Sequence, residues 1–145
     1  MSKFRFKFES VKKVKETFEK KAQKELAQID LIIEKHNILR QKLEDEINDL
    51  RNSAYKKRMN ISELQFLGGY DTVLKQQVQM QSEVIMQLEK KREKKIEEVV
   101  IKTKEKKILN QLEETYRENF YKDINMSELK NFDEIAVQNF NKAKK

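Results

Sequence analysis

The sequence contains no cysteine and no proline, and its only two glycines are adjacent, at Gly68 and Gly69. Without cysteine the chain has no disulfide framework and no thiolate chemistry, which excludes redox and zinc-finger roles and is compatible with a reducing compartment. Without proline, and with glycine at one place only, nothing interrupts a helix over most of the length.

Long apolar runs are also missing. No stretch approaches the roughly 18 consecutive apolar residues that a membrane-spanning helix needs. Residues 1–8 alternate basic and aromatic side chains and lack the apolar centre of a signal peptide. The sequence therefore predicts a soluble protein that is not exported.

Charged residues make up 39% of the 145 positions and hydrophobic residues only 37%, so a wide compact core is not expected. Helices that each bury a narrow stripe fit this composition, and the regular apolar spacing disfavours disorder. The formal net charge of +7 predicts attraction to acidic partners. Charge alone leaves nucleic acid, an anionic membrane face and an acidic protein surface open.

Apolar residues recur in steps of three and four in two long series, a spacing typical of coiled-coil seams. The expected first seam comprises Phe8, Val11, Phe18, Ala22, Leu26, Ile29, Ile32, Ile33, Leu39, Leu43, Ile47, Leu50 and Ala54. The expected second seam comprises Leu74, Val78, Ile85, Leu88, Ile96, Val99, Ile108 or Leu109, Leu112, Tyr116 and Phe120. Because a lone helix cannot bury such a seam, the two series predict an all-α fold, a long antiparallel two-helix coiled-coil hairpin.

One domain over residues 1–145 is expected, with helix one at about 8–58, a turn at about 58–61 and helix two at about 62–123. Ser62 followed by Gln65 fits a capping box that opens the second helix.

Two features of the sequence bear on whether the second helix is continuous. Gly68 and Gly69 fall in its first turns, or else they mark a longer loop with Asp71 capping a later start. Residues 123–127 are expected to interrupt the helix, which leaves a projecting C-terminal helical segment at about 127–143.

No catalytic constellation can be assembled from the sequence, so no enzyme, metal or cofactor is predicted. The only histidine, His36, lies on the first seam and is interpreted as a packed residue, because no second metal ligand is suitably spaced. Gly68-Gly69 followed by Tyr70 and Asp71 cannot form a phosphate-binding loop. The many carboxylates alternate with lysines, which is typical of solvated helix faces.

The basic clusters at residues 90–95 and 102–107 are diluted by glutamates and contain no aromatic residue for base stacking. Solvated coiled-coil flanks are therefore favoured over nucleic-acid sites. Phe4, Phe6 and Phe8 alternate with basic residues and are interpreted as apolar plugs for a partner protein, in preference to a short membrane anchor. The same interpretation applies to Phe132, Ile135 and Phe140.

Four residues near the predicted turn share one face of the second helix: Tyr70, Leu74, Gln77 and Gln81. Core packing is the favoured role for Leu74. Tyr70 is the better docking candidate, because an aromatic residue beside two glycines has little core to enter.

Residues 4–14 (FRFKFESVKKV) form an aromatic-basic opening, and residues 20–27 (KKAQKELA) form a basic segment that carries Ala-x-x-Glu-Leu-Ala. Near the other end, residues 132–140 (FDEIAVQNF) are followed by lysines. These two ends resemble those of the bacterial flagellar export protein FliJ family.

This resemblance implies a hairpin similar to the central stalk of rotary ATPases. The end of the hairpin that carries the chain termini is implied to enter the ring of the flagellar export ATPase FliI. It also implies that the protein promotes ring assembly and hydrolysis, contacts the export gate protein FlhA and escorts export chaperones. The implied location is cytoplasmic, at the inner membrane of the flagellar base, without direct membrane insertion and without nucleic acid.

Residues are carried over position by position from the resemblance. The implied contacts with the ATPase ring are Phe4, Phe6, Phe8, Phe132, Asp133, Glu134, Ile135 and Phe140. The implied gate contacts are Tyr70, Leu74, Gln77 and Gln81, although Gln77 and Gln81 depart from the family's usual residues. The alternatives are a coiled-coil stalk or adaptor of another secretion system, a helical arm that dimerises, and a basic nucleic-acid-binding coiled coil.

Overall fold

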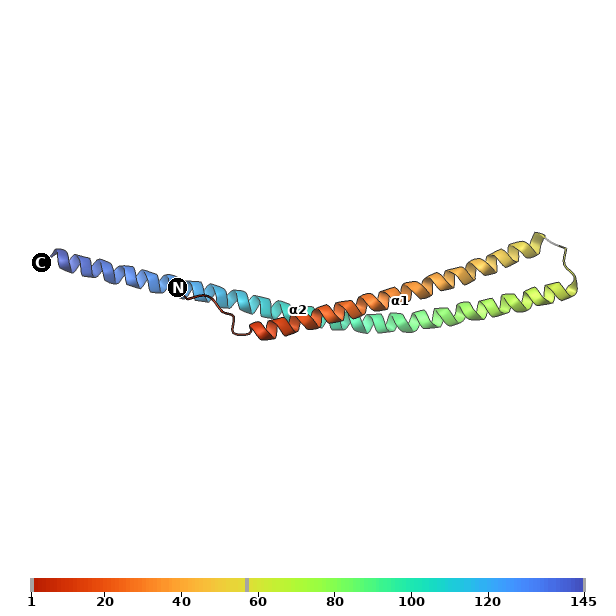
Figure 1. Cartoon of the computed structure of the whole chain (residues 1–145), viewed down its shortest axis with the longest axis horizontal. Coiled ribbons are helices and arrows are strands. Elements are labelled where there is room, and N and C mark those ends of the chain that lie inside the picture. The colour runs from red at the N-terminus through yellow and green to blue at the C-terminus, as the bar shows by residue number, and fades with distance from the viewer. Residues whose placement is uncertain (1, 57, 145) are drawn as a thin grey trace. The chain divides into compact units, whose positions relative to one another are not determined.

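The computed structural model describes residues 2–56 and 58–144. It contains two helices, α1 (Glu9–Lys56) and α2 (Ile61–Ala143), which pack against each other as an antiparallel hairpin (Figure 1). This confirms the predicted fold class. The chain divides into two compact units, one formed by Met1–Glu19 with Ile101–Lys145 and the other by Lys20–Val100.

In the unit formed by residues 20–100, one series of less exposed positions of α1 follows an unbroken alternation of four and three. Its members are Ala22, Leu26, Ile29, Ile33, His36, Arg40, Leu43, Ile47, Leu50 and Ala54. Ile32 and Leu39 were expected in this seam, but each remains 42% exposed. The expectation was wrong for these two residues because the phase set by Leu43–Ala54 leads back through Arg40 and His36, which places Ile32 and Leu39 beside the seam.

The facing seam of α2 in the same unit is apolar at its centre, where Leu74 and Ile85 are buried and Val78 and Leu88 are half-buried. Two polar contacts set its register against α1. Nδ1 of His36 lies 2.7 Å from Oε1 of Gln81, and Nζ of Lys95 lies 2.6 Å from Oε2 of Glu25. The interpretation of His36 as a packed seam residue is confirmed.

In the unit formed by residues 1–19 and 101–145, ionised side chains take the place of the expected apolar seam of α1. Lys12 contacts Glu113, Nζ of Lys15 lies 3.0 Å from Oε2 of Glu105, and Nζ of Lys106 lies 3.4 Å from Oε2 of Glu19. Val11 and Phe18, which were expected in the seam, are exposed. Hydropathy alone misplaced them because here the ion pairs, and not the apolar residues, follow the seam's phase.

In the same unit, the structure shows which of Ile108 and Leu109 belongs to the seam of α2. Leu109 is half-buried whereas Ile108 is exposed, so Leu109 belongs to the seam. Tyr116 and Phe120 continue the series and pack against the aromatic residues that precede α1.

The turn between the helices is closed by an asparagine cap. The backbone N–H of Glu63 donates to Oδ1 of Asn60 at 2.8 Å, and that of Leu64 donates to the carbonyl oxygen of Asn60 at 3.1 Å. The predicted cap at Ser62 is therefore wrong by two residues, since Asn60 provides a side chain of the right type before the first helical residue. Helix α1 ends at Lys56 and not at about residue 58, and Lys57 lies outside the described residues.

Helix α2 continues where interruptions were considered. Gly68 and Gly69 lie within its first turns and have no positive φ, so the longer-loop alternative does not hold. The break expected at residues 123–127 is also absent. Asp, Asn and Ser lower helix propensity by less than about 0.7 kcal/mol each, and without Gly or Pro this does not end a helix.

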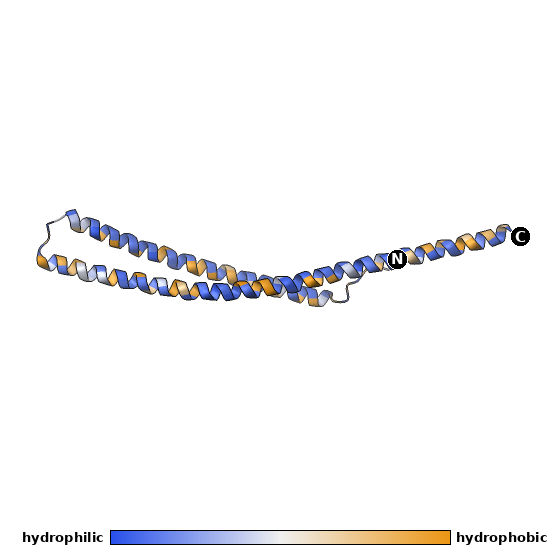
Figure 2. Cartoon of the chain, turned by 180° about the vertical axis from the view of Figure 1, so that it is seen from behind, coloured by the Kyte–Doolittle hydropathy of each residue, from blue (hydrophilic) through white to orange (hydrophobic). Residues whose placement is uncertain are grey.

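The helices are mixed in hydropathy, and the last part of α2 is exposed. Hydrophobic and hydrophilic residues alternate along both helices (Figure 2). From residue 121 to residue 144 every described position is exposed except the half-buried Ile124. None of the described helices has an apolar segment able to cross a membrane.

Candidate functional site

A second apolar row runs along α2 beside its seam, in the unit formed by residues 20–100. Its members each precede a seam position by one residue and also recur in steps of four and three. They are Phe66, Tyr70, Val73, Gln77, Met80 and Val84, all of them exposed. Such a row has the period of a coiled-coil seam but is not buried within the hairpin.

Ile32 and Leu39 of α1 complete this surface. The hydroxyl of Tyr70 donates a hydrogen bond to the carboxylate of Glu46. Glu46 lies seven residues after Leu39 and therefore in the same row of α1. This contact places the row of Tyr70 and the row of Leu39 on one side of the hairpin. We call the two rows together the lateral face.

The opposite side of this unit is polar. Nε of Arg92 lies 2.5 Å from Oδ1 of Asp30, and Nε of Arg51 lies 3.5 Å from Oδ1 of Asp71. Hydrogen bonding to Lys75, with Arg51 nearby, lowers the pKa of Asp71 and favours its ionised form. The two sides therefore differ here, since the ion pairs of Arg92 and Arg51 lie on one side and the uncovered apolar residues lie on the other.

The structure divides the four predicted gate contacts between the lateral face and the hairpin interior. Tyr70 and Gln77 lie on the lateral face. Leu74 is only 3% exposed, and Gln81 contacts His36 across the seam. The hydrogen bond to Glu46 raises the pKa of Tyr70, so the phenol remains a donor at neutral pH.

Sequence reasoning missed several members of the lateral face: Ile32, Leu39, Phe66, Val73, Met80 and Val84 were not assigned to a docking surface. The signal was present, because two apolar series offset by one residue run side by side between residues 66 and 85. Only the series in phase with the partner helix can be the seam, so the other must face outwards.

A second surface lies at the end of α2, in the other unit. We call residues 126–140 the C-terminal apolar segment. Its large apolar side chains are all more than half exposed: Met126, Leu129, Phe132, Ile135, Val137 and Phe140. At about 100° per residue these positions cover more than half of the helix circumference, so no single flat partner covers them all. Asp133 and Glu134 are exposed among them.

The predicted N-terminal plugs are packed within the chain. Residues 2–8 lie before α1, and the ring of Phe6, only 8% exposed, is 5.9 Å from that of Tyr116. The rings of Phe4 and Phe120 are 5.6 Å apart, and those of Phe8 and Tyr116 are 6.3 Å apart. We call residues 2–8 the aromatic strap, because it joins the start of α1 to α2.

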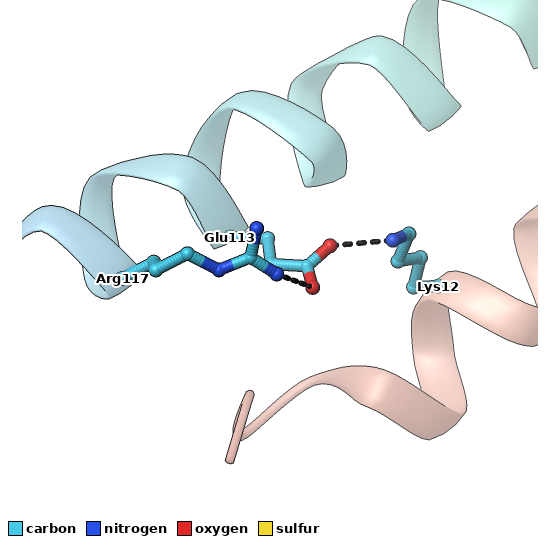
Figure 3. Close-up of polar contacts among 3 residues, drawn as sticks. All are labelled: Lys12, Glu113 and Arg117. Carbon is cyan, nitrogen blue, oxygen red and sulfur yellow. Dashed lines mark hydrogen bonds and ion pairs between the residues drawn. The ribbon is translucent and has the colours of Figure 1, made fainter. Parts of the chain in front are cut away.

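Charges reinforce the strap where α1 begins. The Lys12 ammonium contacts the Glu113 carboxylate, whose other oxygen lies 3.2 Å from Nη2 of Arg117 (Figure 3). The hydrogen bond to Glu113 raises the pKa of Lys12. The Arg117 guanidinium also lies 5.4 Å from the centre of the Phe4 ring. The C-terminal apolar segment is therefore open to contact with another molecule, whereas the aromatic rings of the strap are packed against α2.

The described residues place no group of three or more His, Cys, Asp or Glu side chains where it could hold a metal ion. What this part of the chain offers is binding surface, namely the lateral face in one unit and the C-terminal apolar segment in the other.

Comparison with known proteins gives one clear relationship. The family model described as Flagellar FliJ protein matches residues 4–145, which include residues 4–8 of the strap and both helices. No curated protein and no solved structure matches the chain.

Proposed function

The chain belongs to the FliJ family of flagellar proteins, and on that premise we propose how it works as a component of the flagellar export apparatus. The family consists of structural export components without known catalytic activity. We propose that this member is a stalk that enters the ring of the export ATPase FliI and promotes its assembly and hydrolysis. Its proposed location is the cytoplasmic side of the inner membrane at the flagellar base.

The C-terminal apolar segment is the observation that carries this proposal. A helix that is apolar around more than half of its circumference is stable in water only when a partner surrounds it. The channel of a ring offers such surroundings. Phe132, Ile135 and Phe140 supply the apolar contacts in this proposal, and Asp133 and Glu134 supply charges for basic groups of the ring.

The aromatic strap has a supporting part in this proposal. The rings of Phe4, Phe6 and Phe8 already pack on Tyr116 and Phe120, which limits what they can offer to the ring. The strap holds the start of α1 against α2, and the C-terminal apolar segment is left to make the contact.

Binding promotes assembly by mass action in this scheme. A stalk that contacts several ring subunits binds the assembled ring more tightly than single subunits, and this difference shifts the equilibrium towards the ring.

The lateral face is the proposed docking surface for the export gate protein FlhA and for export chaperones. Tyr70 and Gln77 lie on it, and their neighbours Val73 and Met80 enlarge the apolar contact. Leu74 and Gln81 contribute from the seam, by keeping α1 and α2 at the spacing that the lateral face requires.

The proposal is tested by measuring ATP hydrolysis by the purified export ATPase with and without this protein. We expect the intact chain to raise the turnover and to co-elute with the ATPase. The variant Phe132→Ser/Phe140→Ser should lose most of this effect, because it removes two large apolar contacts.

The variant Val73→Ser/Met80→Ser is the matched control, since it removes similar apolar area from the lateral face. It should stimulate the ATPase normally and bind the cytoplasmic part of the export gate more weakly. Unchanged turnover without co-elution of the intact chain would contradict the proposed stalk role.

A further inference from the structure

Exposed apolar side chains are concentrated at the turn between α1 and α2. Only Phe66 among them belongs to the lateral face, and none belongs to the C-terminal apolar segment. Tyr55, Ile61 and Phe66 are 91%, 75% and 74% exposed, the three highest exposed fractions among the large apolar side chains of the described residues. Leu64 is also more than half exposed. We call residues 55, 56 and 58–66 the tip.

The tip also carries uncompensated positive charge. Lys56, Lys57 and Arg58 follow one another, and Glu63 is the only acidic residue between positions 52 and 70. Lys56 and Arg58 are exposed, and the structure gives neither of them an ion pair within the described residues.

The arrangement of these apolar side chains favours a membrane surface over a folded protein as the partner. Ile61 and Leu64 share one side of the first turn of α2, whereas Phe66 lies about 140° further round the helix. A protein groove that receives a helix reads one stripe of side chains. Side chains that spread around a helix end instead fit a medium that closes around them, such as the interfacial layer of a membrane.

We propose that the tip is a contact site for an anionic lipid surface. Tyr55, Ile61, Leu64 and Phe66 enter the boundary between headgroups and acyl chains, and the exposed cations Lys56 and Arg58 meet the anionic headgroups. Such contact lies in the interface and needs no spanning helix, which is consistent with the lack of an apolar helix of that length in the described residues. Apolar residues at the turn end of α2 are seen in Figure 2.

The test is co-sedimentation of the full chain with vesicles, without any export protein present. We expect the chain to sediment with vesicles of phosphatidylethanolamine and phosphatidylglycerol and to remain in solution with vesicles of phosphatidylcholine. Lys56→Gln/Arg58→Gln should weaken the partition coefficient about fivefold for each charge removed. Ile61→Ser/Phe66→Ser should weaken it by about tenfold.

Two matched variants control for a general loss of charge or hydrophobicity. Lys90→Gln/Lys94→Gln removes two exposed cations of α2, and Phe132→Ser/Phe140→Ser removes two exposed aromatic rings of the C-terminal apolar segment. Both should partition like the unaltered chain. Because all of these positions are exposed, circular dichroism should show the same helicity in every variant.

Three results would overturn the proposal. The chain could fail to sediment with anionic vesicles, which would leave the tip to a protein partner. It could bind as before after Ile61→Ser/Phe66→Ser, or it could weaken equally in the control variants, and either result would mean that lipid binding does not depend on the tip. The proposed stalk role is unaffected by any of them, because it is read from ATP hydrolysis.

Discussion

Single residues inside the hairpin are often ionised, and their pairing sets the pH range in which the fold is stable. The contact with Lys95 lowers the pKa of Glu25, and the contact with Lys15 lowers that of Glu105. Hydrogen bonds to Glu25 and then to Glu98 raise the pKa of Lys95. The groups are solvent-accessible, so each pair contributes little, and their effect on stability comes from their number.

These shifts predict a stability plateau with a fall on both sides. A carboxylate whose pKa is lowered in the folded state stabilises the fold above the pKa of the unfolded state, about 4.3, and this contribution is lost as the pH falls further. A lysine whose pKa is raised loses its contribution only as the pH rises beyond about 10.4. The thermal midpoint followed by circular dichroism should therefore fall in acid, and less so in Lys95→Gln. A midpoint that rises on acidification would contradict the pairing.

The contact between His36 and Gln81 makes a second prediction at this scale. His36→Leu leaves the half-buried amide of Gln81 without this partner and should lower the free energy of unfolding by about 1 kcal/mol. His36→Leu/Gln81→Leu replaces both polar groups by apolar ones and should recover at least that loss. Chemical denaturation of the two variants measures the difference, and additive losses would show that the two side chains do not interact.

At the scale of the helices, the two glycines of α2 weaken its first turns without an evident packing reason. No atom lies within 4 Å of the position that an added Cβ would take at either glycine, and neither has a positive φ. Gly68→Ala and Gly69→Ala should each raise the free energy of unfolding by about 1 kcal/mol. Equilibrium denaturation checks this, and a loss of stability in either variant would mean that the glycine is needed for the helix path.

The cap at Asn60 makes an opposite prediction. Asn60→Ala removes the acceptor for the N–H of Glu63 and should destabilise the start of α2 by about 1 kcal/mol. Ser62→Ala is the control, because Ser62 was the cap expected from sequence and should have little effect. Hydrogen exchange of residues 63–67 distinguishes the two, and equal protection in both variants would refute the cap at Asn60.

The helices and their seams are partly predictable from the sequence alone. Helix type, the turn and most of the second seam follow from period and composition, because no breaker competes with the apolar spacing. The first seam was misplaced at Val11, Phe18, Ile32 and Leu39, since apolar character was followed instead of phase. Counting back in threes and fours from Ala54 leads to His36, Glu19 and Lys12, whose burial hydropathy does not predict.

For the candidate site the sequence predicted the C-terminal aromatics correctly as free of the seam, since no α1 residue remains to pair with them. It did not predict that Phe6 is buried, because strap packing depends on where α1 begins. It separated Tyr70, the better docking candidate, from Leu74, for which core packing was favoured, but it did not separate Gln77 from Gln81. That distinction needs the phase of α2 against α1, which the contacts of His36 and Glu46 supply.

For the molecule as a whole, the proposed function depends on the chain folding back on itself in this register. The ion pairs and the lateral face exist only if Glu25 meets Lys95 and Glu46 meets Tyr70 within one chain. A helix pair formed between two chains would present other surfaces.

The most direct measurement is intramolecular cross-linking with a short bismaleimide on the variant Glu25→Cys/Lys95→Cys. We expect a cross-linked product at the mass of one chain, even at high dilution. Glu25→Cys/Gln81→Cys, in which the second cysteine lies about 21 Å further along α2, should react poorly. A product that joins two chains, or equal yields from the two variants, would contradict the hairpin and the surfaces derived from it.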